Sequence, residues 1–116
     1  MSVSFTEQAV RERRKTVTRR KGWLFLKPGD RLMLCRKVMG RKRGQPLVRI
    51  AEVEVISVRR EPLGHITDDD VEREGFRGMT PHEFIRRFFV EKQRIGPTDE
   101  VTRIEWRYVS ESHVSP

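Results

Sequence analysis

The feature that most constrains the fold is a long strand pattern in the middle of the chain, from Leu47 to Arg59. Apolar and polar side chains alternate along it with a period of two, which is typical of a β-strand with one buried face. The alternation slips near Ile56 and Ser57, and this slip predicts a β-bulge. Shorter strand patterns occur at residues 31–36 and 102–108.

Helix signals lie on both sides of these strands. The spacing of apolar residues predicts a short helix over residues 5–14. Thr67 is the expected N-cap of an acidic helix that ends at Gly75, and Thr80 with Pro81 opens another helix. The apolar residues of that last helix repeat at helical spacing and are expected to face the core: Phe84, Ile85, Phe88 and Phe89.

The order of helix, strands, helices and strand predicts a small α+β domain with short flanking helices. A partly closed β-barrel would hide the edges of the sheet, so we expect that architecture. A single domain is expected over residues 1–109, followed by a flexible tail at 110–116.

The composition indicates the class of protein. The chain has 116 residues, of which 36% are charged and 35% apolar. No apolar run approaches the roughly 20 residues that span a bilayer. The N-terminal residues lack the basic start and apolar centre of a signal peptide, so we predict a cytoplasmic protein. The lone Cys35 cannot form an internal disulfide, in agreement with a reducing compartment.

The charges are unevenly distributed. The net charge is +8, and residues 11–21 hold seven basic side chains against one acid. A second basic cluster lies within residues 36–43, whereas acidic residues gather at 68–74. This asymmetry indicates an anionic partner, and phosphate backbones are the commonest one. The alternative is a solvated basic face that binds nothing.

The segment 14–20 combines a lysine, two threonine hydroxyls and three arginines. A lysine can act as a base, a threonine hydroxyl as a nucleophile, and arginines can bind an anionic substrate. The segment 27–30 follows, and its Pro28-Gly29 pair is the expected centre of a type II turn before a strand. The three histidines show no metal-ligand spacing, so we expect no metal and no cofactor.

These residues together resemble the ASCH family, which belongs to the PUA-like superfamily of small β-barrels. The matching pieces are Lys15-Thr16-Val17-Thr18 with Arg20, Lys27-Pro28-Gly29-Asp30, the long Val/Ile strand, Glu74-Gly75-Phe76 and Ile104-Glu105-Trp106. The resemblance extends from about Phe5 to Tyr108. The Lys-Thr-x-Thr-x-Arg piece is moderately specific, whereas the Pro-Gly-Asp turn is common in proteins.

The resemblance implies work on RNA or its components. Small bacterial ASCH proteins include amidohydrolases that remove the acetyl group of N4-acetylcytidine. By position, the resemblance implies a catalytic trio of Lys15, Thr18 and Glu74. The sequence departs from the family pattern in two ways: Arg13 stands where a glycine is often found, and residues 40–44 form an extra basic loop.

Elementary chemistry sets conditions on this trio. Lys15 can act as a base only if its pKa falls toward roughly 7 to 8, and burial with repulsion from Arg14, Arg19 and Arg20 would lower it. Residues three apart on an ideal strand point to opposite faces, so Lys15 and Thr18 converge only if the chain turns between them.

The other candidate residues have equally ordinary alternatives. Arg19 and Arg20 are candidates for substrate binding, and Arg20 would bind a carbonyl or a phosphate unless it is a surface charge. Trp23 is a candidate for stacking on a base, although its apolar neighbours favour core packing. Glu72 lies two residues from Glu74 on the same expected helix and is its rival.

The expected function is therefore a metal-free amidohydrolase acting on N4-acetylcytidine or a related modified nucleoside. The alternatives are a non-catalytic RNA-binding module and a ribonuclease in which Lys15 and the arginines stabilise a charged phosphoryl transition state. The expected partner is a modified nucleoside or RNA, and no membrane.

Overall fold

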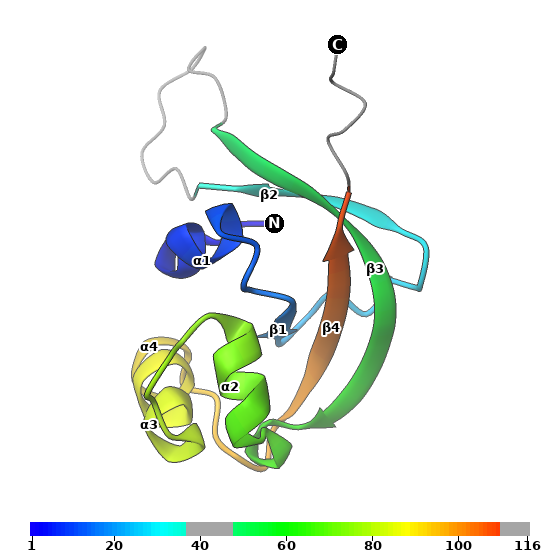
Figure 1. Ribbon diagram of the computed structural model, residues 1–116. Coiled ribbons are helices and arrows are strands. Elements are labelled where there is room, and N and C mark those ends of the chain that lie inside the picture. Colours follow the sequence, from blue (N-terminus) through cyan, green and yellow to red (C-terminus); the bar gives the residue numbers. More distant parts are fainter. Residues whose placement is uncertain (37–47, 110–116) are drawn as a thin grey trace, which may run out of the picture.

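The computed structural model describes residues 1–36 and 48–109. Within these residues, four strands form one antiparallel sheet in the order β1-β4-β3-β2 (Figure 1). The strands are β1 (Val17–Arg20), β2 (Arg31–Cys35), β3 (Arg49–Pro62) and β4 (Glu100–Tyr108). The expected basic loop at 40–44 and the expected tail at 110–116 lie outside the described residues.

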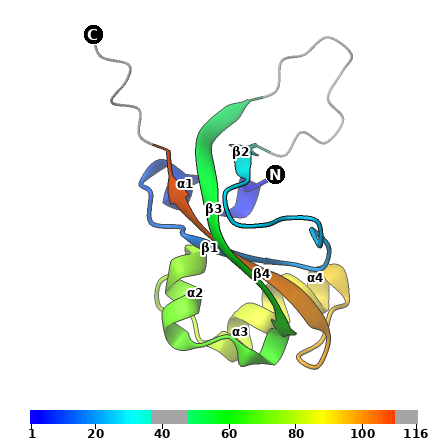
Figure 2. The same ribbon diagram turned by 90° about the vertical axis from the view of Figure 1, so that its right-hand side faces the viewer.

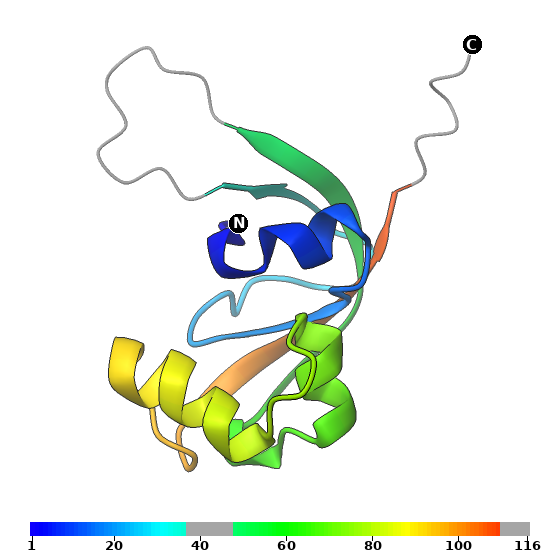
Figure 3. The ribbon, with the colours of Figure 1, turned by 60° about the vertical axis from the view of Figure 1, so that its left-hand side comes forward.

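The helices lie together on the concave side of the curved sheet (Figure 3). They are η1 (Ser4–Thr6), α1 (Glu7–Arg11), η2 (Leu63–His65), α2 (Asp68–Glu74), α3 (Pro81–Ile85), the π-helical η3 (Arg86–Val90) and α4 (Glu91–Gln93). Figure 2 shows the long strands β3 and β4 crossing on the side away from α1. This arrangement is the α+β class that the sequence predicts.

The strand predictions are confirmed where they fall on described residues. β3 pairs with both β2 and β4, and its register with β4 shifts between Val55 and Ser57. This shift is the expected β-bulge. Gly29 has a φ of 96°, and the Asp30 N–H donates to the Lys27 carbonyl at 3.1 Å, as the expected turn requires.

The predicted helix over residues 5–14 is wrong in its bounds. A short 3-10 turn precedes α1, and α1 ends at Arg11. Arg13 ends the helical path because its φ of 59° is left-handed. This is the position where the ASCH pattern often has glycine, a residue that adopts positive φ without strain.

A barrel is not confirmed, because the sheet of the described residues is open and β1 and β2 form its edges. The N-terminal residues cover part of the β2 edge instead. Ser2 forms a parallel bridge with Cys35, and the Val3 N–H donates to the Cys35 carbonyl at 2.9 Å. Covering an edge in this way serves the purpose that barrel closure would serve.

Two apolar clusters hold the domain together. One lies between the N-terminal segment and the sheet and includes Val10, Leu34, Val53 and Trp106. The other lies among α2, α3, η3 and the start of β4, and it contains three of the four residues of the predicted stripe: Phe84, Ile85 and Phe89. Among the described residues, no helix is long and apolar enough to cross a membrane.

Helix α2 has the ends that the sequence predicts. The Thr67 side chain accepts a hydrogen bond from the Asp70 N–H at 3.1 Å, and Gly75 follows the helix with a φ of 112°. A Cβ atom at Gly75 would lie 3.0 Å from Ala9 Cβ and 3.3 Å from Thr6 Cγ2. Glycine therefore allows the end of α2 to approach the N-terminal helices closely.

We predict that Gly75→Ala lowers the free energy of unfolding by about 2 kcal/mol or more, because left-handed strain and overpacking add. Gly29→Ala is the matched control, since Gly29 also has positive φ but has open space around its Cβ position. That control should cost about 1 kcal/mol. Urea unfolding measures both values, and equal losses would contradict the close packing at Gly75.

Candidate active site

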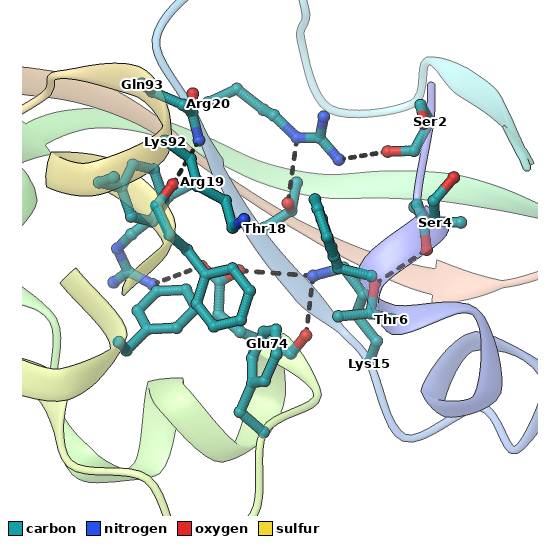
Figure 4. Close-up of a pocket in the computed structure, with 16 residues that line it drawn as sticks. Ser2, Ser4, Thr6, Lys15, Thr18, Arg19, Arg20, Glu74, Lys92 and Gln93 are labelled. Atoms are coloured by element: carbon teal, nitrogen blue, oxygen red, sulfur yellow. Dashed lines mark hydrogen bonds and ion pairs between the residues drawn. The ribbon is translucent and has the colours of Figure 1, made fainter. Parts of the chain in front are cut away.

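A pocket of about 620 Å³ lies between the N-terminal segment and the helices η3 and α4 (Figure 4). Its volume falls within the range of roughly 300–1,000 Å³ that is usual for small-molecule sites. Sixteen residues line it: Ser2, Val3, Ser4, Phe5, Thr6, Lys15, Thr18, Arg19, Arg20, Glu74, Phe76, Phe84, Phe88, Phe89, Lys92 and Gln93. The pocket therefore combines charged and polar side chains with five phenylalanines.

The backbone of Lys15 is held from several directions. Its carbonyl oxygen accepts hydrogen bonds from Trp106 Nε1 at 2.9 Å and from the Tyr108 hydroxyl at 2.6 Å. The Arg13 guanidinium lies 5.6 Å from the centroid of the Tyr108 ring. Strand β4 and the left-handed turn at Arg13 thus fix the point from which the Lys15 side chain enters the pocket.

The Lys15 side chain is 3% exposed and contacts Glu74 twice. Its Nζ donates to the Glu74 backbone carbonyl at 2.8 Å and lies 3.4 Å from Glu74 Oε1. Burial lowers the pKa of Lys15 to about 8; Glu74 opposes this shift, and the positive charges of Arg20 and Arg19 add to it. Arg14, which was also expected to lower it, is half-buried and pairs with Glu12 at 2.6 Å, and it is not among the main causes of the shift.

Glu74 is also 3% exposed. Burial raises the pKa of Glu74, although the nearby Lys15 and Arg19 act in the opposite direction. Desolvation therefore moves both members of the Lys15–Glu74 pair toward their uncharged forms. Glu72, the rival on the same helix, is exposed and does not line the pocket.

Arg19 connects the pocket to a buried network of ion pairs. Its guanidinium donates to Glu74 at 3.2 Å, to Glu61 at 3.0 Å and to Asp70. Arg103, which is paired with Arg19 in the sheet, donates to the same Asp70 carboxylate at 2.8 and 3.1 Å. Burial alone would favour a protonated Asp70, but the hydrogen bonds from Arg103 and Arg19 hold its pKa well below the usual range.

Thr18 and Arg20 lie two residues apart on β1 and share one face of it. Arg20 Nε donates to Thr18 Oγ1 at 3.2 Å, and Arg20 Nη2 donates to the Ser2 carbonyl at 2.7 Å. Thr18 is 3% exposed, so its hydroxyl is shielded from bulk water. A guanidinium at this distance stabilises negative charge that develops on the threonine oxygen.

The rest of the pocket wall is aromatic. The Phe88 ring lies 4.6 Å from the Phe76 ring, 5.6 Å from Phe84 and 5.8 Å from Phe5, measured between centroids. Phe5 is 68% exposed. These rings, which are tilted against one another by 40 to 66°, give the pocket an apolar wall that a heterocycle can contact.

The structure brings together five of the six residues that the sequence singles out. Lys15, Thr18 and Glu74 line one pocket with Arg19 and Arg20. The chain turns before β1 begins at Val17, and this turn allows residues 15 and 18 to reach the same space. Arg19, however, donates its hydrogen bonds to three carboxylates of the protein. It is therefore better suited to positioning Glu74 than to binding a substrate.

Trp23 is the residue that does not join them. It lies outside the pocket lining, packs against the apolar cluster beside the sheet, and contacts the Phe25 ring at 5.5 Å. The structure therefore does not place Trp23 with the other candidates, and its stacking on a base stays a prediction. Core packing, the alternative, is what the structure shows.

Sequence reasoning missed Phe5, Phe88 and Lys92 as pocket residues. Phe88 is expected in the core; it lies in the π-helical η3, packs against the apolar cluster and also lines the pocket. Insertions of this kind are frequent at functional sites but have no sequence signal here. Among the described residues, no group of His, Cys, Asp and Glu is placed to hold a metal ion.

The comparisons with known proteins concern the fold. No family model and no curated protein matches the sequence. A solved structure of a protein from Enterococcus faecalis V583, described with the family model DUF984, is similar over 89% of this chain with 19% identity and a TM-score of 0.67. This chain spans 66% of the length of that protein.

The solved ASCH domain from Lactobacillus crispatus JV V101 is also similar. It matches 90% of this chain and 70% of its own length, with 12% identity and a TM-score of 0.65. At these identities the similarity shows a shared fold. The chain therefore has an ASCH-like fold, as its sequence predicts.

We predict opposite effects of two substitutions on the pKa of Lys15. Glu74→Gln should lower it below about 8, because the carboxylate that stabilises the ammonium form is lost. Arg20→Gln should raise it, because a repelling charge is lost. A carbon-13 NMR titration of the Lys15 Cε resonance measures both shifts. Shifts of the same sign in the two variants would contradict the electrostatic account.

Proposed function

We propose that this protein is a metal-free amidohydrolase that deacylates N4-acetylcytidine or a related modified nucleoside. The observation that carries the proposal is the buried Lys15–Glu74 pair in a pocket that Thr18 also lines. A lysine with a lowered pKa beside a carboxyl group with a raised pKa is typical of acid–base sites. The ASCH-like fold agrees with this assignment by analogy.

The protonation state of the pair matters for the mechanism. An ammonium with a carboxylate and a neutral amine with a carboxylic acid contain the same number of protons, so pH does not select between them. The Arg19 hydrogen bond to Glu74 at 3.2 Å favours the charged arrangement, whereas burial penalises both charges and moves the pair toward the neutral arrangement. In that arrangement Lys15 can accept a proton while Glu74 can donate one.

The first chemical step forms an acyl-enzyme. The Thr18 hydroxyl loses its proton to Lys15 Nζ, and the oxygen bonds to the acetyl carbon of the substrate. Arg20, which donates to Thr18 Oγ1, stabilises the negative charge that develops on the threonine oxygen during the attack. The C–N4 bond then breaks, Glu74 protonates the leaving nitrogen, and cytidine departs.

The second step releases acetate. Water attacks the acetyl-Thr18 ester and gives one proton to the Glu74 carboxylate. The ester C–O bond breaks, and the Thr18 oxygen recovers a proton from Lys15. The side chains return to their starting states, and the acetic acid that forms ionises in solution.

A non-catalytic RNA-binding module is the second candidate. It would use the same pocket, since a base can stack on its phenylalanines and cations can bind a phosphate. Binding alone does not require a buried lysine with a pKa of about 8, whereas a base does. The lysine therefore favours catalysis.

We expect purified protein to convert N4-acetylcytidine to cytidine, measured by chromatography. Thr18→Val and Lys15→Met should each lower kcat by at least about a hundredfold, because each removes a reacting group while keeping an apolar side chain in its place. Thr16→Val and Glu72→Gln are matched controls from the same strand approach and the same helix, and they should retain activity. No cytidine from folded protein would contradict the assignment to this substrate.

The pH dependence gives a separate test. Above about 8 the Lys15–Glu74 pair loses its shared proton, and Glu74 then has none to donate. We therefore expect kcat/KM to fall as the pH rises through about 8, after subtraction of the rate without enzyme. A rate that keeps rising above pH 8 would show that Lys15 acts without an acidic Glu74.

A further inference from the structure

Two cations of the pocket lack the carboxylate partners that the others have. Among the charged residues that line it, Lys15 pairs with Glu74, and Arg19 pairs with three carboxylates. Within the described part of the chain, neither Arg20 nor Lys92 has an acidic group within ion-pair distance; the Arg20 guanidinium is bound only to neutral oxygens.

This imbalance is costly for a partly buried group. Burial lowers the pKa of Arg20, and the more distant charge of Glu74 offsets this only in part. A guanidinium that has lost water without gaining an anion raises the free energy of the protein. The Nη1 atom of Arg20 has no hydrogen-bond partner among the described residues, so this nitrogen can donate to a ligand. A ligand with an anionic group would supply the partner.

Lys92, which is exposed and lines the pocket, supplies a second positive charge. It extends from α4 toward the N-terminal segment, and its Nζ lies 5.4 Å from the centroid of the Phe5 ring. In the view of Figure 4, Arg20 and Lys92 lie on one side of Thr18, and Glu74 lies on the opposite side. An anion held by the two cations would thus sit beside the reacting groups and away from Glu74.

The phenylalanines of the pocket indicate the chemistry of the rest of the ligand. Phe5 and Phe88 pack edge to face and offer an apolar surface, and arginine with lysine offers the donors that phosphate prefers. A heterocycle joined to a phosphate would contact the phenylalanines and also pair with Arg20 and Lys92. An uncharged nucleoside would leave both cations without an anion.

We propose that the pocket binds its pyrimidine as a phosphorylated unit, with Arg20 and Lys92 binding the phosphate group and the phenylalanines contacting the base. The inference rests on the proposed function in assigning the base to the same pocket. The phosphate belongs either to a mononucleotide or to a nucleotide within RNA, and both present the same group to the two cations.

Calorimetry with unacetylated ligands tests this proposal without any turnover, so its failure is distinct from failure of the hydrolase assignment. Cytidine, cytidine 5′-monophosphate and cytidine 3′-monophosphate are titrated separately into the full chain. We expect one of the monophosphates to bind at least about tenfold more tightly than cytidine, as charge-assisted contacts to a phosphate would give. Equal affinities of cytidine and both monophosphates would overturn the proposal, as would no binding of any ligand.

Variants locate the phosphate. Lys92→Gln and Arg20→Gln should each reduce the affinity for the preferred monophosphate by about three- to thirtyfold, and Lys92→Gln should leave that for cytidine nearly unchanged. Lys27→Gln is the matched control, because Lys27 is exposed and lies outside the pocket lining. An equal loss in the Lys27 variant would overturn the assignment, because it would show attraction by net charge alone.

A trinucleotide with a central cytidine separates the two sources of phosphate. If it binds more tightly than the monophosphate and loses affinity in the Lys92 variant, the phosphate group belongs to RNA. If the monophosphate binds more tightly, the ligand is a free nucleotide. A trinucleotide whose affinity is untouched by both Lys92→Gln and Arg20→Gln would bind elsewhere and would contradict the proposal.

Discussion

The interaction on which the site depends is the buried contact of Arg19 with the carboxylates of Asp70, Glu61 and Glu74. It joins β1 to helix α2 and to the end of β3, and Arg103 of β4 reinforces it through Asp70. Buried ion pairs of this kind contribute little net stability, but removing one partner leaves an uncompensated charge. The network therefore holds Glu74 in position, because Arg19 contacts its carboxylate from β1 while it is itself held by Asp70 and Glu61.

Fixing Glu74 has a chemical consequence. The carboxyl group lies beside Lys15 in a region that excludes water, and the same desolvation raises the pKa of one group and lowers that of the other. Arg19 offsets part of the shift at Glu74, so the network positions the acid and also tunes it. The ASCH-like fold supplies the scaffold, and the chemistry comes from these particular side chains.

The sequence predicted the parts of the molecule that local rules govern. The caps of α2, the Pro28-Gly29 turn, the bulge in β3 and the closing strand all follow from residue types at short spacing. It failed where tertiary contacts decide. Helix α1 ends at Arg11, before the left-handed Arg13, and the N-terminal segment covers a sheet edge in place of a barrel closure. The pairing of Arg19 with carboxylates 42 to 55 residues away also had no local signal.

The most direct test of the account is to find where the acyl group goes. Protein quenched with acid during turnover of N4-acetylcytidine is digested, and its peptides are sequenced by mass spectrometry. The account predicts an acetyl ester on Thr18 that is absent from the Thr18→Val variant. An acetyl group on Lys15, or steady turnover by Thr18→Val, would contradict it and would assign the attack on the substrate to another group.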